Sequence, residues 1–383
     1  DRNMSWKTAA LGEVITLKRG YDLPHDMRAD GDVPVVSSSG ITGYHNESKV
    51  KAPAVVTGRY GTLGEVFYVE QDCWPLNTAL YVMDFKGNRP KYIYYFLQNL
   101  LKGMQSDKAA VPGVNRNDLH ARLVTFASTD SLQKSIEEFL GGYDSLIENC
   151  KRRISLLEDS IRLLYREWFV FLRFPGHEHI EVHDGVPAGW KRLNIKDCCA
   201  KVSYGYTATA AIEKIGPKFL RITDIVPDFI VWESVPQCEI DEKGKEKYKL
   251  SEGDIVVART GATVGYAKLI TGAEEDAVYA SYLVRFKPDP NIVDSLILGT
   301  FMESKEYKEF VRSNAGGAAQ PNANAQILGA AKLLVPTKEI QQLFRSYCED
   351  SFKLRENLIK QIAVLKKSRD LLLPRLMNGD ITV

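Results

Sequence analysis

Arginine, asparagine and tyrosine side chains recur beside glycines at two distant places in this chain. Arg59-Tyr60-Gly61 and Arg259-Thr260-Gly261 each follow a short β-branched run. Arginine can bind phosphates and guanine edges, and asparagine can bind adenine edges, so these residue types suit the reading of DNA. Two separate segments of the chain therefore carry residue types that could contact a nucleic acid.

The candidate contacts share a polar or aromatic side chain at a position that the sequence predicts to be a loop or a strand end. In the first half of the chain they are Lys18, Arg19, Tyr21, Lys51, Arg59, Tyr60, Asn115 and Arg116. In the second half they are Lys201, Tyr204, Tyr206, Lys218, Arg221, Arg259, Thr260, Asn322 and Asn324.

Most of these residues also have a purely structural explanation. Arg59 and Arg259 precede a glycine turn and can brace it through bonds to carbonyl groups. Asn115 and Asn324 are equally suited to forming turns. The aromatic rings of Tyr204-Gly205-Tyr206 can wedge at bases, or they can pack in a core. Both readings stay open at this point.

Catalytic motifs are missing from the sequence. It contains no Asn/Asp-Pro-Pro-aromatic tetrapeptide of an amino-methyltransferase and no P-loop. Pro227-Asp228 and Pro288-Asp289 are not followed closely by the Glu-x-Lys of a metal-dependent nuclease. His177, His179 and His183 have the spacing of metal ligands, but they lie in a Pro/Gly-rich segment, where a solvated loop is expected. We predict a chain without an active site and without a metal.

Composition restricts the kind of DNA-binding surface. Fifty Lys and Arg against 49 Asp and Glu give a net charge of +1, so any DNA-binding face must be a local patch. The six cysteines form no C-x-x-C pair, which favours reduced structural thiols. No signal sequence and no membrane-spanning apolar run is apparent. We expect a cytoplasmic protein with no membrane partner.

An internal duplication organises the chain. Trp6-Lys7 recurs as Trp190-Lys191, and the Arg-x-Gly turn at Arg59 recurs at Arg259. Glu148-Asn149 recurs 208 residues later as Glu356-Asn357. Because the order is kept while the spacing drifts, two copies that diverged by loop insertion explain the pattern.

Each copy ends in a long stripe of apolar residues spaced by three and four. The first stripe runs through Leu132, Ile136, Phe139, Tyr143, Leu146, Cys150, Ile154, Leu157, Ile161, Leu164 and Trp168. The second runs through Ile340, Phe344, Tyr347, Ser351, Leu354, Leu358, Ile362, Leu365, Arg369, Leu372 and Leu376, broken only by the serine and the arginine. Sustained spacing of this kind predicts two coiled-coil helices that pair with each other, antiparallel, through apolar cores.

Local signals in these helices predict irregularities. Gly141-Gly142 predicts a bend or a close backbone approach in the first helix. Pro374 predicts that the second helix ends or kinks near Leu373. The charged runs Lys151-Arg152-Arg153 and Lys366-Lys367 suit a solvated face, or a contact with a partner or with DNA phosphates.

The remaining segments predict two mixed α+β domains with pseudo-twofold symmetry. Strands are expected at Val33-Pro34-Val35-Val36, Pro53-Ala54-Val55-Val56, Asp254-Ile255-Val256-Val257 and Tyr282-Leu283-Val284-Arg285-Phe286, and helices near 91–104 and 293–312. We predict globular domains at residues 1–130 and 190–338, helical segments at 131–173 and 339–377, a linker at 174–189 that breaks helix and strand, and a tail at 378–383.

The ordered set of motifs resembles the specificity subunits of type I restriction-modification enzymes. The set comprises the opening tryptophan with Leu11-Gly12, the two Arg-x-Gly turns, the loop from Gly316 to Asn322, and the segments 164–169 and 373–379 that close the helices. The resemblance covers nearly the whole chain. It implies that each globular domain is a target-recognition domain and that the helical segments separate them.

That resemblance also implies a function and partners. A specificity subunit recognises a bipartite, asymmetric site in double-stranded DNA and carries two modification subunits and, in addition, restriction subunits. S-adenosylmethionine, ATP and magnesium would be bound by those partners, with no cofactor in this chain. The alternative is a coiled-coil scaffold whose two domains bind ligands other than DNA.

Overall fold

A computed structural model of the chain describes residues 5–59, 65–106, 115–211, 216–273, 276–317 and 321–383. The contacts divide the chain into two compact units. The first comprises Asp1–Ile147 and Leu365–Val383, and the second comprises Glu148–Val364. Two long helices, α5 (Asp130–Tyr165) and α11 (Lys338–Met377), each contribute one segment to each unit.

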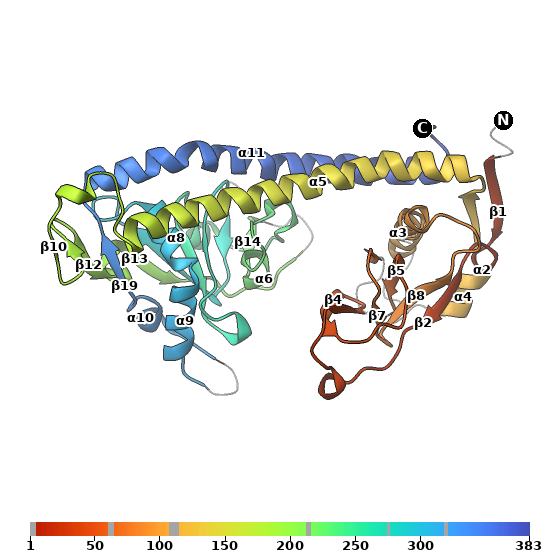
Figure 1. The fold of residues 1–383 in the computed structure, drawn as a ribbon, viewed down its shortest axis with the longest axis horizontal. Helices are drawn as coiled ribbons and strands as arrows, with labels where there is room; N and C mark the ends of the chain where they lie inside the picture. Colours follow the sequence, from red (N-terminus) through yellow and green to blue (C-terminus); the bar gives the residue numbers. More distant parts are fainter. Residues whose placement is uncertain (1–4, 60–64, 107–114, 212–215, 274–275, 318–320) are drawn as a thin grey trace. The chain divides into compact units, whose positions relative to one another are not determined.

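The first unit is built on a four-stranded antiparallel sheet in the order β2-β8-β5-β6. These strands are β2 (Thr16–Arg19), β8 (Ala79–Asp84), β5 (Ala54–Gly58) and β6 (Val66–Val69). Strand β5 is buried along its whole length, and its β-branched side chains suit a strand covered on both faces. Helix α3 (Pro90–Ser106) packs against β5 and β6 (Figure 1).

Smaller elements complete the first unit. Its other strands are β1 (Trp6–Ala10) paired with β9 (Leu123–Ala127), and β3 (Val33–Ser37) paired with β4 (Gly40–His45) and β7 (Trp74–Pro75). Its other short helices are α2 (Leu11–Val14), the 3₁₀ turn His25–Met27 and α4 (Arg116–Ala121). The main core joins α2, α3 and the sheet to Ile136 and Leu140 of α5 and to Leu373 and Leu376 of α11.

The second unit repeats this topology. Its four-stranded sheet has the order β13-β18-β15-β16, with β13 (Cys199–Tyr204), β18 (Leu283–Pro288), β15 (Ile255–Ala258) and β16 (Ala267–Leu269). Strand β12 (Lys191–Asn194) pairs with β19 (Lys332–Val335), as β1 pairs with β9. The parallel pair of β14 (Phe219–Leu220) and β17 (Val278–Tyr279) corresponds to that of β3 and β7.

Short helices cover the second sheet. They are α6 (Ile222–Ile225), α7 (Glu242–Tyr248), α8 (Ser295–Met302), α9 (Lys305–Asn314) and α10 (Ala325–Leu328), with 3₁₀ turns at Ile195–Cys198, Trp232–Ser234 and Gly261–Thr263. Helix α8 packs against β16, and α10 contacts both α9 and β13 (Figure 1). The predicted mixed α+β fold with an internal duplication is confirmed.

Two equivalent glycines show that the duplication extends to backbone contacts. A Cβ atom on Gly20 would lie 2.2 Å from the carbonyl oxygen of Leu76, and one on Gly205 would lie 2.2 Å from that of Ala280. The following tyrosines form equivalent parallel bridges, Tyr21 with Leu76 and Tyr206 with Ala280. Only glycine permits so close a backbone approach, which explains why both copies have it at this point.

Two buried glutamines hold the beginnings of the long helices in the same way. The Gln133 side chain donates to the Ala127 carbonyl at 2.8 Å and accepts from the Arg89 amide at 2.9 Å. Gln341 donates to the Pro336 carbonyl at 2.9 Å and accepts from the Asp294 amide at 2.7 Å. Each glutamine therefore satisfies backbone groups of its own domain from a position inside the helix.

The two helices run antiparallel within each unit. In the second unit Glu158 of α5 bonds to Arg355 of α11. Cys150 comes earlier in α5 than Glu158, and it lies beside Gln361, which comes later in α11 than Arg355. In the first unit Asp144 bonds to Arg369 in the same sense.

The predicted apolar stripe was wrong by one residue at several positions. Leu140 and Ile147 are buried in α5, whereas the predicted Phe139 and Leu146 are 39% and 54% exposed. In α11, likewise, Cys348 and Arg355 are buried, whereas Tyr347 and Leu354 are exposed. Because each exposed residue of α5 stands next to an apolar one, spacing by three or four cannot tell which of two neighbours faces the core.

Helix α11 does not end near Leu373, which was one of the two outcomes expected from Pro374. It continues to Met377, and Gly379 then adopts a positive φ of 68°, which is typical of a helix C-terminus. Leu376 and Met377 are almost fully buried in the first unit's core. Burial of this last turn offsets the hydrogen bond that the proline cannot donate.

Two further expectations also need correction. A Cβ on Gly142 would meet nothing within 4 Å, and one on Gly141 only side-chain atoms at 3.8 Å. The close backbone approach, one of the two outcomes expected at these glycines, is therefore not found, and α5 continues through them. The segment expected to break helix and strand contains a 3₁₀ turn at His177–His179 and a two-stranded hairpin of β10 (Val182–His183) and β11 (Val186–Pro187). Asp184 and Gly185 provide the positive φ angles that this tight turn requires.

Within the described ranges, no helix is both long enough and apolar enough to cross a membrane.

The glycine contacts give a first prediction. Gly205→Ala should destabilise the chain by about 1–3 kcal/mol, because the added methyl group collides with a backbone carbonyl that cannot move alone. Gly142→Ala is the matched control and should be neutral or stabilising by up to about 1 kcal/mol, as expected for alanine in an open helix position. Chemical denaturation of the two full-length variants measures both effects. Equal stability of the two variants would contradict the assigned role of Gly205.

Candidate nucleic-acid interface

The Arg-x-Gly turn of the second unit is held by backbone bonds from two other segments. The Arg259 amide donates to the Tyr282 carbonyl at 3.0 Å, and the Arg259 carbonyl accepts from the Ala323 amide at 2.9 Å. Gly261, with a φ of 72°, donates to the Pro321 carbonyl at 2.9 Å. These bonds fix the turn at the end of β15 beside the loop that precedes α10.

The Arg259 side chain lies over an aromatic ring. Its guanidinium group is 5.0 Å from the centre of the Tyr204 ring, a cation–π distance. The Tyr204 hydroxyl accepts a hydrogen bond from the Ala325 amide at 3.0 Å, which holds the ring in place. The Arg259 Nε atom is buried and has no hydrogen-bond partner among the described residues. A guanidinium group held in one orientation over an aromatic ring suits an anionic or polar ligand.

Polar backbone and side-chain groups surround this arginine. Thr260 and Gly316 both form isolated bridges with Asn322, whose side chain is exposed. Asn324 caps α10, its side-chain oxygen accepting from the Ile327 amide at 2.9 Å. The structure thus brings together five of the predicted residues, Tyr204, Arg259, Thr260, Asn322 and Asn324, which we name the Arg259 cluster.

Four predicted residues of the second unit have other surroundings. Lys218 donates to the carbonyls of Glu233 and Val235, and Arg221 binds both carboxylate oxygens of Asp224. Tyr206 packs against a small core with its ring 5.4 Å from that of Tyr248. Lys201 is exposed on β13.

The first unit gathers its predicted residues at the end of β2. The Lys18 ammonium lies 5.7 Å from the centre of the Tyr21 ring, and the Tyr21 hydroxyl is 2.9 Å from that of Tyr81. Arg19 is exposed and donates to the Asn77 carbonyl at 3.3 Å. The Arg59 amide donates to the Thr78 carbonyl, which is the equivalent of the bond from Arg259 to Tyr282.

Other predicted residues of the first unit lie elsewhere or have a structural role. Lys51 forms an exposed ion pair with Asp72 at 2.6 Å. Asn115 caps α4 by accepting from the Asn117 amide, and Arg116 follows it, exposed, in the first turn. Tyr60 lies outside the described residues, as do residues 318–320 of the glycine-rich loop.

The linker histidines and the cysteines have ordinary surroundings. His177 bonds to the Phe174 carbonyl at 2.8 Å and His183 lies 3.3 Å from Glu181. The described part of the chain contains no group of three or more side chains placed to hold a metal ion. Burial raises the pKa of the Cys73 and Cys238 thiols to about 11, which keeps them protonated at neutral pH.

Sequence reasoning missed two residues. Tyr282 is 61% exposed and supplies the carbonyl that holds Arg259. His120 accepts a hydrogen bond from the Leu17 amide through Nε2 at 2.9 Å and so ties α4 to β2. The duplication signalled neither residue, because Tyr282 corresponds to Thr78 in the other copy and His120 lies one residue beyond the matched Asn-x-x-x-Leu motif.

The contact of His120 predicts a pH dependence. Burial, and then the nearby charges of Arg116 and Lys86, lower the pKa of His120 below its usual value. Its neutral Nε2 is the acceptor, so the bond stabilises the fold above a pH of about 6.5, the pKa in the unfolded chain, and is lost as the pH falls through the lowered folded-state pKa. Thermal denaturation between pH 8 and pH 5 should show a smaller loss of stability for His120→Gln, which accepts the bond without titrating. Gly142→Ala, which removes no titrating group, is the control and should keep the wild-type pH dependence.

Comparisons with known proteins place these observations in context. The model of the type I restriction modification DNA specificity domain matches residues 3–159 and 187–363, one match for each copy of the repeat. The chain is 26% identical over 318 residues to the type I restriction enzyme MjaIX specificity subunit of Methanocaldococcus jannaschii, covering 76% of this chain and 69% of that relative. It is 22% identical over 300 residues to the MjaVIII specificity subunit of the same organism, covering 76% and 70% of the two chains.

A solved structure has a similar fold. The crystal structure of a type I restriction-modification S subunit from M. genitalium superposes with a TM-score of 0.52 at 14% identity, covering 98% of this chain and 97% of that one.

Proposed function

The chain belongs to the family of type I restriction modification DNA specificity proteins, and we propose that it reads double-stranded DNA for a type I restriction-modification complex. The observation that carries the proposal is the Arg259 cluster, in which the Arg259 guanidinium group lies over the Tyr204 ring and a backbone hydrogen bond holds that ring in place. Arginine in such a setting can bind a guanine edge or a phosphate.

In this proposal catalysis belongs to the partners. Two modification subunits bind S-adenosylmethionine and methylate adenine, and restriction subunits add ATP- and magnesium-dependent cleavage. This chain chooses the DNA sequence and positions them. The absence of methyltransferase, P-loop and nuclease motifs from the sequence supports this division of labour.

We further propose that the DNA site is bipartite and asymmetric. Support comes from the repeated topology, in which the amides of Arg59 and Arg259 donate to backbone carbonyls at equivalent positions, Thr78 and Tyr282. The side chains around these two arginines differ. Arg19 stands before Gly20 where Tyr204 stands before Gly205, and Thr78 stands where the other copy has Tyr282. Two domains that share a backbone topology but differ in the side chains around the arginine would bind two different half-sites.

The bipartite site can be tested by mapping methylation. The full-length chain, purified with its modification subunit and S-adenosylmethionine, should methylate adenines in one split motif with a spacer of constant length. Sequencing that detects modified bases on randomised DNA measures the motif directly. Methylation without sequence preference, or of a single uninterrupted motif, would contradict the proposal.

Arg259 provides a residue-level test. Arg259→Ala should weaken binding to the cognate site about ten- to a hundredfold, which corresponds to roughly 1–3 kcal/mol for a base-reading arginine. Arg259→Lys should recover little of the loss, because lysine keeps the charge but not the planar donor group. The charge-matched control is Lys305→Ala, an exposed residue paired with Glu309. Titration of labelled DNA at fixed salt measures all three variants, and equal affinities for the alanine variants would remove Arg259 from the interface.

A further inference from the structure

Two arginines of helix α11 occupy positions where the other copy of the repeat has isoleucine. With the 208-residue offset between Glu148 and Glu356, Arg355 corresponds to Ile147, and Arg369 corresponds to Ile161. Both isoleucines are buried, at 3% and 6% exposure. The Arg355 side chain is only 9% exposed and that of Arg369 only 19%, so the arginines occupy core positions of the helix pair.

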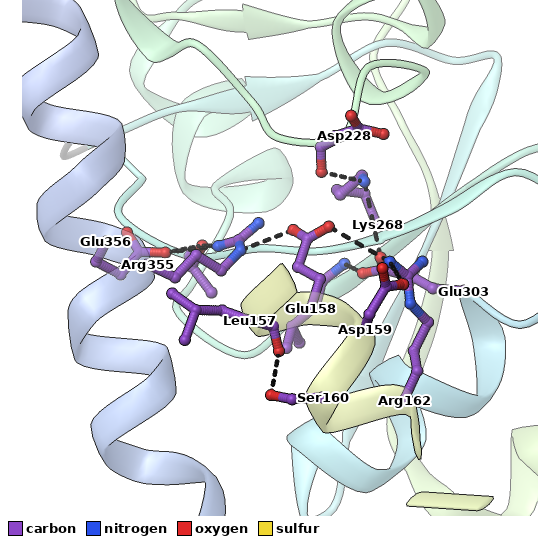
Figure 2. A network of polar contacts seen from close by, with 12 residues as sticks. Leu157, Glu158, Asp159, Ser160, Arg162, Asp228, Lys268, Glu303, Arg355 and Glu356 are labelled. Atoms are coloured by element: carbon purple, nitrogen blue, oxygen red, sulfur yellow. Dashed lines mark hydrogen bonds and ion pairs between the residues drawn. The ribbon is translucent and has the colours of Figure 1, made fainter. Parts of the chain in front are cut away.

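Arg355 contacts two glutamates within the second unit. Its Nε donates to Glu158 of helix α5 at 2.8 Å, and its NH1 donates to Glu356 at 2.8 Å (Figure 2). Thr271, from the domain, donates to the same oxygen of Glu356 at 2.9 Å. Burial raises the pKa of Glu158, an effect that the charge of Arg355 and its hydrogen bond oppose. Without Arg355 this carboxylate would be a buried, poorly compensated charge.

Arg369 makes the corresponding contact within the first unit. Its NH1 donates to Asp144 of helix α5 at 2.6 Å, while Nε and NH2 bind Asp370. The Tyr95 hydroxyl donates to the second oxygen of Asp144 at 2.5 Å. Both arginines of α11 thus find a carboxylate of α5 across the helix pair, in the same antiparallel register.

A chain with an internal repeat has an alternative pairing, because each helix resembles its partner. If α5 paired with the α5 of a second copy in this register, Glu158 would face Ile147 and Asp144 would face Ile161. If α11 paired with a second α11, Arg355 would face Lys366 and Arg369 would face Phe352. Each like-with-like pair removes the carboxylate or guanidinium that each buried charge contacts on the other helix. In the α11 pair, Arg355 and Arg369 would retain only their own neighbours Glu356 and Asp370, and Arg355 would be set against the cation Lys366.

We propose that the pairs Arg355–Glu158 and Arg369–Asp144 make α5 selective for α11 and exclude like-with-like pairing between two copies of this chain. Buried polar residues at core positions select partner and register in paired helices, often at a cost in stability. Here the selection favours pairing of α5 with α11 of the same chain. The four side chains disfavour pairing of either helix with the same helix of a second chain.

The register provides a reporter for the test. The Cys150 sulfur lies 3.8 Å from the Gln361 side-chain oxygen, so Gln361→Cys places two thiols together when α5 pairs with α11. Pairing of α11 with a second α11 in the same register would instead place position 361 of one chain opposite position 360 of the other, so the introduced thiols of the two chains would lie one residue apart along the pair. Two full-length chains with different affinity tags are co-expressed, oxidised and examined by mass spectrometry of the cross-linked peptides.

The apolar variant tests the proposal directly. In the Gln361→Cys background, Glu158→Leu, Arg355→Ile, Asp144→Asn and Arg369→Ile remove the charges, and asparagine keeps an acceptor for Tyr95. This variant should stay folded, yet the cross-link between the two tagged chains at position 361 should rise at least about tenfold over the parent. An apolar variant that folds and forms only the cross-link to Cys150 would overturn the proposal, because the charges would then contribute no selectivity.

A charge exchange separates pairing from general stability and covers the case in which the apolar variant fails to fold. Glu158→Arg alone or Arg355→Glu alone should reduce the cross-link to Cys150 at least about tenfold, and the double exchange should restore it to within about twofold. The exchange Glu148→Lys with Lys151→Glu, at an exposed pair within α5, is the matched control and should leave the cross-link unchanged. Failure of the double exchange to restore the cross-link would overturn the proposal.

Discussion

Burial of the apolar stripes on α5 and α11 is the interaction on which both units depend. Neither domain encloses its core alone. In the first unit Leu373 and Leu376 of α11 complete a core that begins with Leu11 and Ile15. In the second, Trp168 and Phe169, in the π-helical turn Arg166–Val170 that follows α5, pack with Trp190 and Phe344. Because each helix belongs to both units, a change in helix pairing would alter both cores together.

Much of the fold was predictable because the same sequence patterns occur in both copies of the repeat. The β-branched runs at Val33 and Asp254 became β3 and β15, and the apolar spacing located both long helices. Where the sequence offered two apolar neighbours, as at Phe139-Leu140, it could not decide which is buried. The helix end expected at Pro374 was wrong because the tendency of proline to end a helix competes with the burial of Leu376 and Met377. That burial depends on contacts with residues far away in sequence.

The residue types of the candidate interface were predictable from the sequence, but the contacts of the individual arginines were not. Residue type selects Arg221 as readily as Arg259. In the structure, however, Asp224 accepts hydrogen bonds from the Arg221 guanidinium group, whereas the Arg259 guanidinium group lies over the Tyr204 ring. A partner three residues away could have been suspected for Arg221. The contact of Arg259 with a residue 55 positions earlier in the chain could not, because it exists only once β13 and the turn after β15 are in place.

The buried glutamines have a consequence for how such a protein changes over generations. Gln133 and Gln341 bind main-chain groups, and Gly20 and Gly205 are required by main-chain carbonyls. Main-chain groups are the same whatever side chains a loop displays. Substitutions on the loops of one unit therefore leave these scaffold bonds intact, and the other unit has its own separate set. A lineage can acquire a new surface in one copy of the repeat while it keeps the old surface in the other.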